Sequence, residues 1–91
     1  MTFILIAHDK PGALEIRKAN RDAHLAYLSE TGVGTFGGPM LDADGNMCGS
    51  MLILDVADMA AAEAWAAGDP YAKAGLFDSV EIKWFKQVVG L

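Results

Sequence analysis

Apolar side chains fill two continuous runs of this chain. The first run covers residues 3–7 and stops at the turn-forming stretch 9–12, and the second covers residues 51–54 after Gly49-Ser50. Neither run alternates with polar residues, which is typical of strands that are apolar on both faces. We therefore predict strands over residues 2–8 and 51–56, each needing cover on both sides.

Residues 13–30 carry their apolar positions at helical spacing instead. One stripe consists of Ile16, Ala19, Ala23 and Tyr27, and a second consists of Leu14, Leu25 and Leu28. Gly32 is suited to end the helix that these stripes predict. At about 100° per residue, a third strip runs along one edge of the helix and brings together two cations and an imidazole: Arg17, Arg21, His24 and Leu28.

The centre of the chain is rich in glycine. Residues 33–38 have Phe36 as their only large side chain, so we predict a strand that another part of the protein approaches closely. We expect Gly37-Gly38-Pro39 to end this strand. Residues 40–47 are polar, and their Asp44-Gly45 pair suits a reversal of direction before the second apolar run.

Two further helical segments and a strand are predicted in the last third of the chain. Asp58 precedes the alanine-rich residues 59–67, so it is a candidate N-cap for a helix anchored by Trp65. Residues 72–77 indicate a helical turn interrupted by Gly75. Residues 80–89 alternate between two faces, which is typical of a half-exposed last strand.

These elements follow one another as strand, helix, strand, strand, helix, strand in one domain of residues 1–91. In so short a chain, this order predicts a ferredoxin-like α+β fold, an antiparallel sheet with two helices on one face. The helices cover only one face, yet the two apolar runs are apolar on both. We therefore expect a homodimer in which two sheet faces close a shared barrel-like interior.

Composition narrows the classes of partner. The chain is 53% hydrophobic with a formal net charge of -5, which excludes a disordered chain and argues against nucleic acids and anionic membrane surfaces as partners. Cys48 is the only cysteine, so no internal disulfide forms and a reducing compartment is expected. The run 3–7 is too short for a signal-peptide core or a membrane span. We expect a soluble cytoplasmic protein.

Asp69 stands where one helical pattern ends and another begins, in Gly68-Asp69-Pro70-Tyr71. Asp before Pro is a favoured N-cap arrangement, which is sufficient reason for its presence. A catalytic role needs a base nearby, and His24 is preferred to His8, which lies at a strand end. The histidines, the cysteine and the carboxylates show no metal-ligand spacing, and no phosphate-binding fingerprint occurs, so we expect no metal and no cofactor.

Several motifs carry a resemblance to a known family. They are residues 7–10 (Ala-His-Asp-Lys), residues 21–25 (Arg-Asp-Ala-His-Leu), residues 38–40 (Gly-Pro-Met), residues 49–50 (Gly-Ser), residues 69–71 (Asp-Pro-Tyr) and residues 74–75 (Ala-Gly). With them the chain resembles, over nearly its full length, the YciI-like (YCII-related) family of dimeric α+β barrels. The resemblance implies a His–Asp active-site pair that maps onto His24 and Asp69.

The resemblance also implies a range of chemistry. Members with known activity eliminate halide from chlorinated hydroxyquinones, and the wider superfamily includes lactone isomerases and cofactor-free oxygenases. The loop after Met40 is very short here, which leaves the substrate open. In this interpretation the chain is a small-molecule enzyme that performs elimination, isomerisation or a lactone-type reaction on a small cyclic substrate.

The roles of the individual residues are hypotheses with structural alternatives. Asp69 would hold His24 as a general acid/base. Arg17 or Arg21 would hold an anionic oxygen, unless they are surface cations lying over apolar neighbours. Ring hydroxyls would bond to two candidates that also suit a strand entry and a core position: Ser50 and Tyr71. The competing functions are a non-catalytic small-ligand-binding or stress-associated dimeric module and a pure assembly domain.

Overall fold

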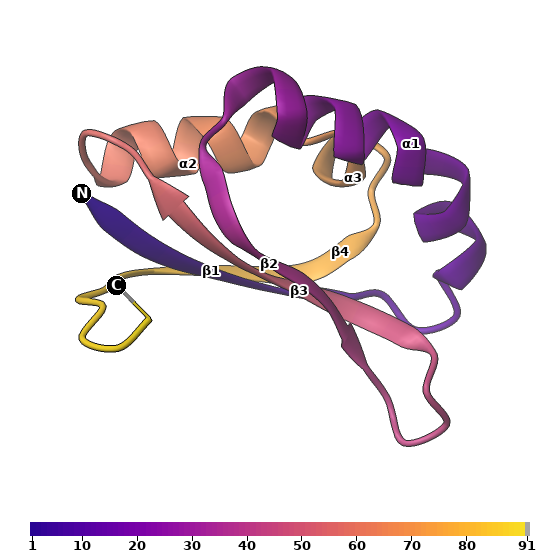
Figure 1. Cartoon of the computed structure of the whole chain (residues 1–91). Helices are drawn as coiled ribbons and strands as arrows, with labels where there is room; N and C mark the ends of the chain where they lie inside the picture. Colours follow the sequence, from indigo (N-terminus) through magenta and orange to yellow (C-terminus); the bar gives the residue numbers. More distant parts are fainter. Residues whose placement is uncertain (91) are drawn as a thin grey trace.

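A twisted antiparallel sheet with all helices on one side forms the protein (Figure 1). The computed structural model describes residues 1–90. Its elements are β1 (Thr2–Asp9), α1 (Leu14–Thr31), β2 (Gly34–Leu41), β3 (Met47–Asp55), α2 (Met59–Gly68), α3 (Pro70–Lys73) and β4 (Phe77–Trp84). The strands lie in the order β2-β3-β1-β4. The predicted ferredoxin-like α+β fold is confirmed, with α3 as one added helical turn.

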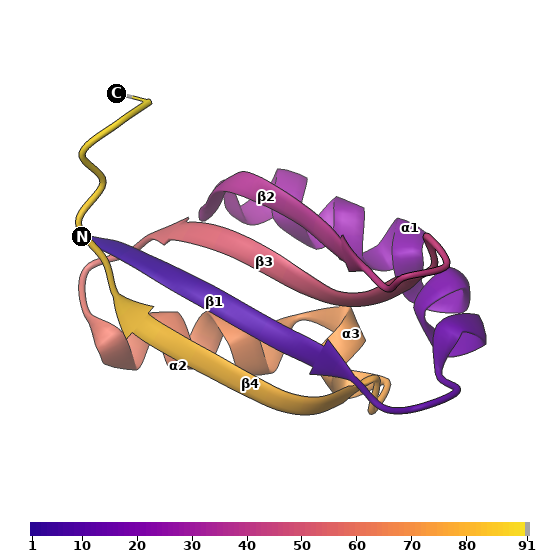
Figure 2. The same ribbon diagram turned by 90° about the horizontal axis from the view of Figure 1, so that it is seen from below.

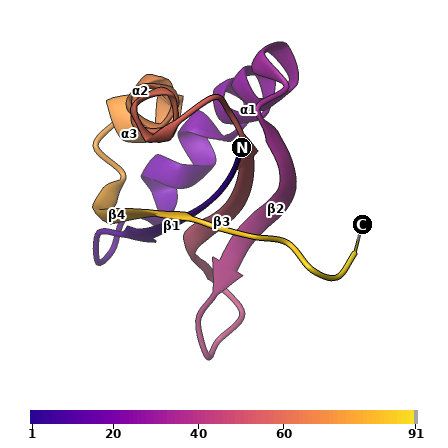
Figure 3. The ribbon, with the colours of Figure 1, turned by 90° about the vertical axis from the view of Figure 1, so that its left-hand side faces the viewer.

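The core lies between the sheet and the helices. Phe3, Leu5 and Ala7 of β1 are buried against the helices, and the register pairs the first two with Leu54 and Leu52 of β3. Viewed along the sheet, α1 lies over the β2 side and α2 over the β4 side (Figure 3). The alternation of strand side chains thus directs every second residue of β1 into one apolar layer.

The opposite face of the sheet carries no helix (Figure 2). Ile4 pairs with Ile53 and Ile6 with Met51, and all four side chains are half-buried on this face. Phe36 of β2, which is opposite Ile53, is 70% exposed. Within residues 1–90 an apolar face is therefore left open, as the two apolar runs predicted. We call the side chains of Ile4, Ile6, Phe36, Met51 and Ile53 the open face.

Four predicted boundaries differ from the structure. β3 begins at Met47 rather than at residue 51, because Met47 to Ser50 pair with Leu41 to Pro39 of β2. β2 does not end at residues 37–39 but continues to Leu41. It is an edge strand, where Pro39 is tolerated because its nitrogen, which has no hydrogen to donate, can face away from β3. The helical turn is Pro70–Lys73 rather than 72–77, since Gly75 adopts φ +74° and ends it. β4 is Phe77–Trp84 rather than 80–89. The Phe85 N–H donates to the carbonyl of Thr2, and Thr2 is the first residue of β1. Residues after Phe85 therefore have no β1 residue to pair with.

Gly37 is the position of the edge strand β2 where a glycine is required by its surroundings. Its φ is +150°, and a Cβ there would overlap the backbone carbonyl oxygen of Met51 and the Leu52 residue. β2 and β3 therefore approach each other through a position that tolerates no side chain. The close approach predicted for this strand is confirmed, and the neighbouring element is β3.

The buried face of α1 is not the apolar stripe that the sequence suggested. Arg17 and His24 are buried, whereas Ile16 is 38% and Leu25 46% exposed. The Ala19 and Ala23 positions of the same stripe are exposed as well. The predicted helix is confirmed, and its buried polar positions are those that have a charged partner, Asp9 for Arg17 and Asp69 for His24.

Candidate active site

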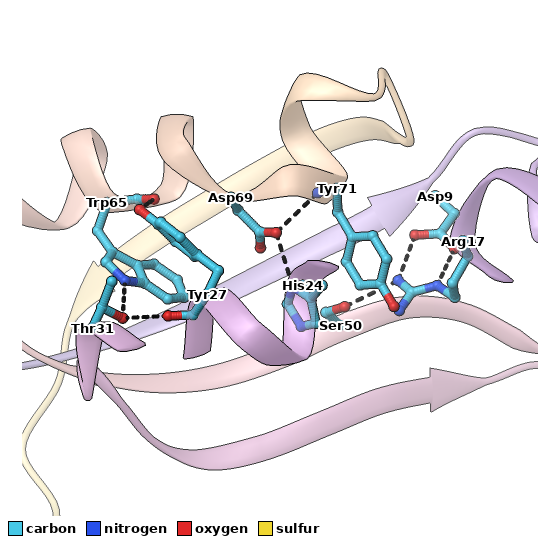
Figure 4. A network of polar contacts seen from close by, with 9 residues as sticks. All are labelled: Asp9, Arg17, His24, Tyr27, Thr31, Ser50, Trp65, Asp69 and Tyr71. Carbon is cyan, nitrogen blue, oxygen red and sulfur yellow. Dashed lines mark hydrogen bonds and ion pairs between the residues drawn. The ribbon is translucent and has the colours of Figure 1, made fainter. Parts of the chain in front are cut away.

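His24 and Asp69 form the centre of a polar network between α1 and the joint of α2 and α3 (Figure 4). His24 projects from the middle of α1, and Asp69 lies at the joint where α2 passes into α3. Their Nδ1 and Oδ1 atoms are 2.8 Å apart. The residues are 7% and 3% exposed, respectively. The contact predicted across 45 positions of sequence is therefore present, and its chemical role stays a prediction.

Asp69 performs the capping role as well. Its Oδ1 accepts a hydrogen bond from the backbone N–H of Tyr71 at 2.9 Å, at the start of α3. An ionised carboxylate only accepts, so Nδ1 of His24 donates and a neutral ring keeps its lone pair on Nε2. Every fully buried polar side-chain atom within residues 1–90 has a partner. Nε2 has none there, so it keeps access to solvent.

The ring of Tyr71 lies between the imidazole and a guanidinium. It stacks on His24 with the ring centres 4.0 Å apart and the planes at 16°, and Cζ of Arg17 lies 4.7 Å from the same ring centre. Burial raises the pKa of Tyr71, Arg17 and Arg21 oppose this rise, and Asp69 adds to it. The phenol is therefore a neutral hydroxyl at physiological pH.

Arg17 is held in a buried ion pair. Its Nε and Nη2 atoms donate to the two carboxylate oxygens of Asp9 at 2.7 and 2.8 Å, and Nη2 also donates to Oγ of Ser50 at 3.0 Å. Burial lowers the pKa of Arg17, but Asp9 and, to a smaller extent, Tyr71 raise it, and the net shift is upward. The guanidinium is thus permanently charged and already neutralised by a carboxylate.

Asp9 is the member of this network that sequence reasoning missed. It follows the first apolar run after His8 and precedes Lys10-Pro11-Gly12, so the sequence pattern indicated a turn residue. The available signal was its position at the end of a buried strand, close in sequence to a helix bearing Arg17. That signal alone does not distinguish an ion-pair partner from a turn former.

A second set of contacts ties the end of α1 to α2. The Tyr27 hydroxyl donates to the backbone carbonyl of Trp65 at 2.8 Å, and Nε1 of Trp65 donates to Oγ1 of Thr31 at 2.9 Å. A Cβ on Gly68 would lie 2.5 Å from the Tyr27 hydroxyl, so a side chain there would displace the tyrosine from this contact. These contacts fix the spacing between α1, which carries His24, and α2, which ends at Asp69 (Figure 4).

A cavity of about 220 Å³ lies between α1 and the β2–β3 hairpin. Its polar wall contains five of the six predicted site residues: Arg17, Arg21, His24, Ser50 and Tyr71. Its apolar lining includes Leu25, Leu28, Pro39, Met47 and Leu52. The predicted strip of α1 thus lines one wall. Asp69 lies behind His24, outside the lining.

Other hollows are less suited to this chemistry. One of about 310 Å³ adjoins Asp9 and shares Met47 with the cavity, but no histidine lines it. Another, of about 450 Å³, is bordered by Thr2 and residues 84–87, and it contains no imidazole and no carboxylate. His8 is exposed at the end of β1 and lines none of the hollows described. We therefore take the smaller cavity beside His24 as the candidate site.

Neither a metal-ligand group nor a spanning helix is found in the described part of the chain. No group of three or more His, Cys, Asp or Glu side chains within residues 1–90 is arranged to hold a metal ion. Over the same residues, every helix is too short or too polar to cross a bilayer.

Comparison with known sequences places the chain beside small bacterial proteins. The family model of the YCII-related domain matches residues 1–86. The chain is 38% identical to protein YciI of Escherichia coli O6:H1 (strain CFT073), with 97% of this chain and 99% of the relative covered. An uncharacterized protein of Haemophilus influenzae Rd is 37% identical over the same shares.

Comparison with solved structures adds a chemically defined neighbour. 5-Chloro-2-hydroxyhydroquinone dehydrochlorinase from Burkholderia phenoliruptrix AC1100, in complex with 2,5-dihydroxybenzoquinone, superimposes with a TM-score of 0.90 at 35% identity, covering 97% of this chain and 96% of that one. An antibiotic biosynthesis monooxygenase matches with a TM-score of 0.59 at 13% identity, and this likeness concerns the fold alone. The protomer therefore has the predicted dimeric α+β barrel fold.

Proposed function

The chain belongs to the YCII-related domain family, and from this premise we propose that it is a small-molecule enzyme with His24 and Asp69 as its general acid/base pair. The observation that carries the proposal is the 2.8 Å contact between Nδ1 and Oδ1 at the wall of a cavity sized for one ring. The dehydrochlorinase, a relative with a cyclic ligand, supports the substrate class.

The pair supports two proton transfers. While Nδ1 of His24 donates to Asp69, Nε2 can accept a proton from a ring hydroxyl, and the carboxylate stabilises the imidazolium that results. The imidazolium can then return the proton to a ring carbon. These two transfers complete an isomerisation. Elimination of HCl needs one further step, in which a second ring hydroxyl gives its proton to Nε2, the C–Cl bond breaks and chloride leaves with the bonding electron pair, so that the ring becomes a quinone.

The hydroxyls of Ser50 and Tyr71 are proposed to orient the ring. Both residues line the cavity, and the Ser50 hydroxyl already accepts from Arg17. Its own proton is then free to be donated to a substrate oxygen. We propose that Arg17 contributes to binding as a fixed part of the wall, since its charge is paired with Asp9.

An assay with 5-chloro-2-hydroxyhydroquinone tests the proposal and the role of Asp69. We expect the wild type to release chloride and Asp69→Asn to lower kcat by at least about 10-fold, because Asn still caps α3 but cannot stabilise an imidazolium. Asp58→Asn is the matched control, since Asp58 caps α2 through a 2.8 Å bond from Ala61 N and lies outside the cavity.

Two results would contradict the acid/base proposal. One is equal kcat in Asp69→Asn and wild type. The other is a wild type that binds the ring without releasing chloride or isomerising it. The non-catalytic ligand-binding module would then be favoured, and the low exposure of His24 would reflect a structural role. In that case a bound ring should raise the Tm equally in wild type and His24→Asn.

We also propose that two copies pair through the open face. The apolar side chains of Ile4, Ile53 and the exposed Phe36 form a surface that a second, identical face would cover. Light scattering at micromolar concentration should give a mass of two chains for the wild type. Ile53→Lys should give one chain, because it places a charge at the centre of the contact.

Ile16→Lys serves as the control for this experiment. Ile16 is an exposed isoleucine on α1, on the opposite side of the protomer from the open face. The Ile16→Lys variant should remain dimeric. A single-chain mass for the wild type, or dimers for Ile53→Lys, would contradict the dimer. We further propose a cytoplasmic location, in keeping with the single cysteine.

A further inference from the structure

We propose that the cavity binds its ring substrate as an anion, a phenolate or enolate, and that the Arg21 guanidinium is the counter-ion. The inference rests on the proposed function, because it concerns the same cavity, and it adds the charge state of the substrate. It also separates two arginines that are equivalent in the sequence pattern.

The charges in the cavity wall cancel in two pairs. Arg17 is held by Asp9 through two hydrogen bonds of 2.7 and 2.8 Å, and any positive charge on His24 is balanced by Asp69 at 2.8 Å. No hydrogen bond or ion pair joins Arg21 to another residue within 1–90. Arg21 is therefore the one wall residue that brings a positive charge to the cavity without a carboxylate of its own.

The position of Arg21 suits it to meet a ligand. It lies four residues after Arg17 and three before His24, so it shares their strip on α1 and lines the same cavity. Unlike those two residues it is exposed, so its side chain can adapt to a guest. Arg21 also opposes the rise in the pKa of Tyr71, which places its charge within reach of the phenol on the cavity wall.

Because much of the remaining lining is apolar, the positive charge of Arg21 determines whether the cavity can hold an anion. The apolar side chains of Pro39, Met47 and Leu52 lie on the opposite wall, and an anion beside them would lose water without gaining a partner. A guanidinium binds such an oxygen with charge-assisted hydrogen bonds. The oxyanion is also the species that forms when Nε2 of His24 removes a hydroxyl proton. The same contact would therefore stabilise the charge that develops during turnover.

Calorimetry with two quinones tests the inference without turnover. The probe is 2,5-dihydroxybenzoquinone, the ligand of the related dehydrochlorinase, and the neutral comparison is 2,5-dimethoxybenzoquinone, which has no ionisable hydroxyl. At neutral pH we expect Arg21→Gln to weaken binding of the dihydroxy compound about 10- to 100-fold and to leave binding of the dimethoxy compound unchanged. Arg21→Lys should recover part of the affinity, since it restores the charge.

Lys18→Gln is the matched control. Lys18 is an exposed cation of α1 that lies outside the cavity lining, so its removal changes the net charge equally and should leave both affinities unchanged. The inference is overturned if the wild type does not bind the dihydroxy compound, or if Arg21→Gln binds it as tightly as wild type. It is also overturned if Arg21→Gln loses affinity for both quinones alike. Because binding alone is measured, an inactive acid/base pair would leave the expected result intact.

Discussion

His24→Asn is expected to lower kcat about 100- to 10,000-fold, the range that general acid/base catalysis contributes. The asparagine amide can still donate to Oδ1 of Asp69, so the polar contact and the fold are retained. What is lost is Nε2, the ring nitrogen that keeps access to solvent and exchanges the proton. The measurement is kcat for chloride release at saturating substrate, with circular dichroism to check the fold.

His8→Asn is the control for this expected loss. It makes the identical change at the only other histidine, which is exposed at the end of β1 and outside the cavity lining. Its kcat should equal that of the wild type. Full activity in His24→Asn would rule out the acid/base role, and a similar loss in both variants would point to a general effect on folding.

The largest effect on stability is expected for Arg17→Met. Removing the guanidinium leaves the Asp9 carboxylate buried without its partner and deprives Ser50 and the Tyr71 ring of a contact. Breaking a buried pair from one side typically costs about 3–5 kcal/mol in the free energy of unfolding. For a chain of 91 residues this is a large share of the total stability. Urea unfolding followed by circular dichroism measures it.

Two comparisons identify the cause of this loss. Lys18→Met removes an exposed cation of the same helix and should change the free energy of unfolding by less than about 1 kcal/mol. Replacing Asp9 and Arg17 together by leucine and methionine should recover much of the loss, because neither charge is then left unpaired. A loss below about 1 kcal/mol for Arg17→Met, or a larger loss in the double variant, would contradict the role of the ion pair.

Much of the candidate site follows from local sequence signals. The spacing of Arg17, Arg21 and His24 along one strip of a helix follows from 3.6 residues per turn, and all three line the cavity. Asp69 before Pro70 follows from capping preferences, and the structure has that cap. The contact between His24 and Asp69 was foreseen from the family resemblance, since no spacing rule links residues 45 positions apart.

The sequence by itself determined the order of the elements, because the period of the apolar pattern and the capping residues act over a few neighbours. Only the tertiary structure decided which strip of α1 is buried and that Asp9 holds Arg17, leaving Arg21 free. The physical reason is that a buried charge is stable only beside its partner. Such partners come from other elements, and the packing of α1 on the sheet brings them together.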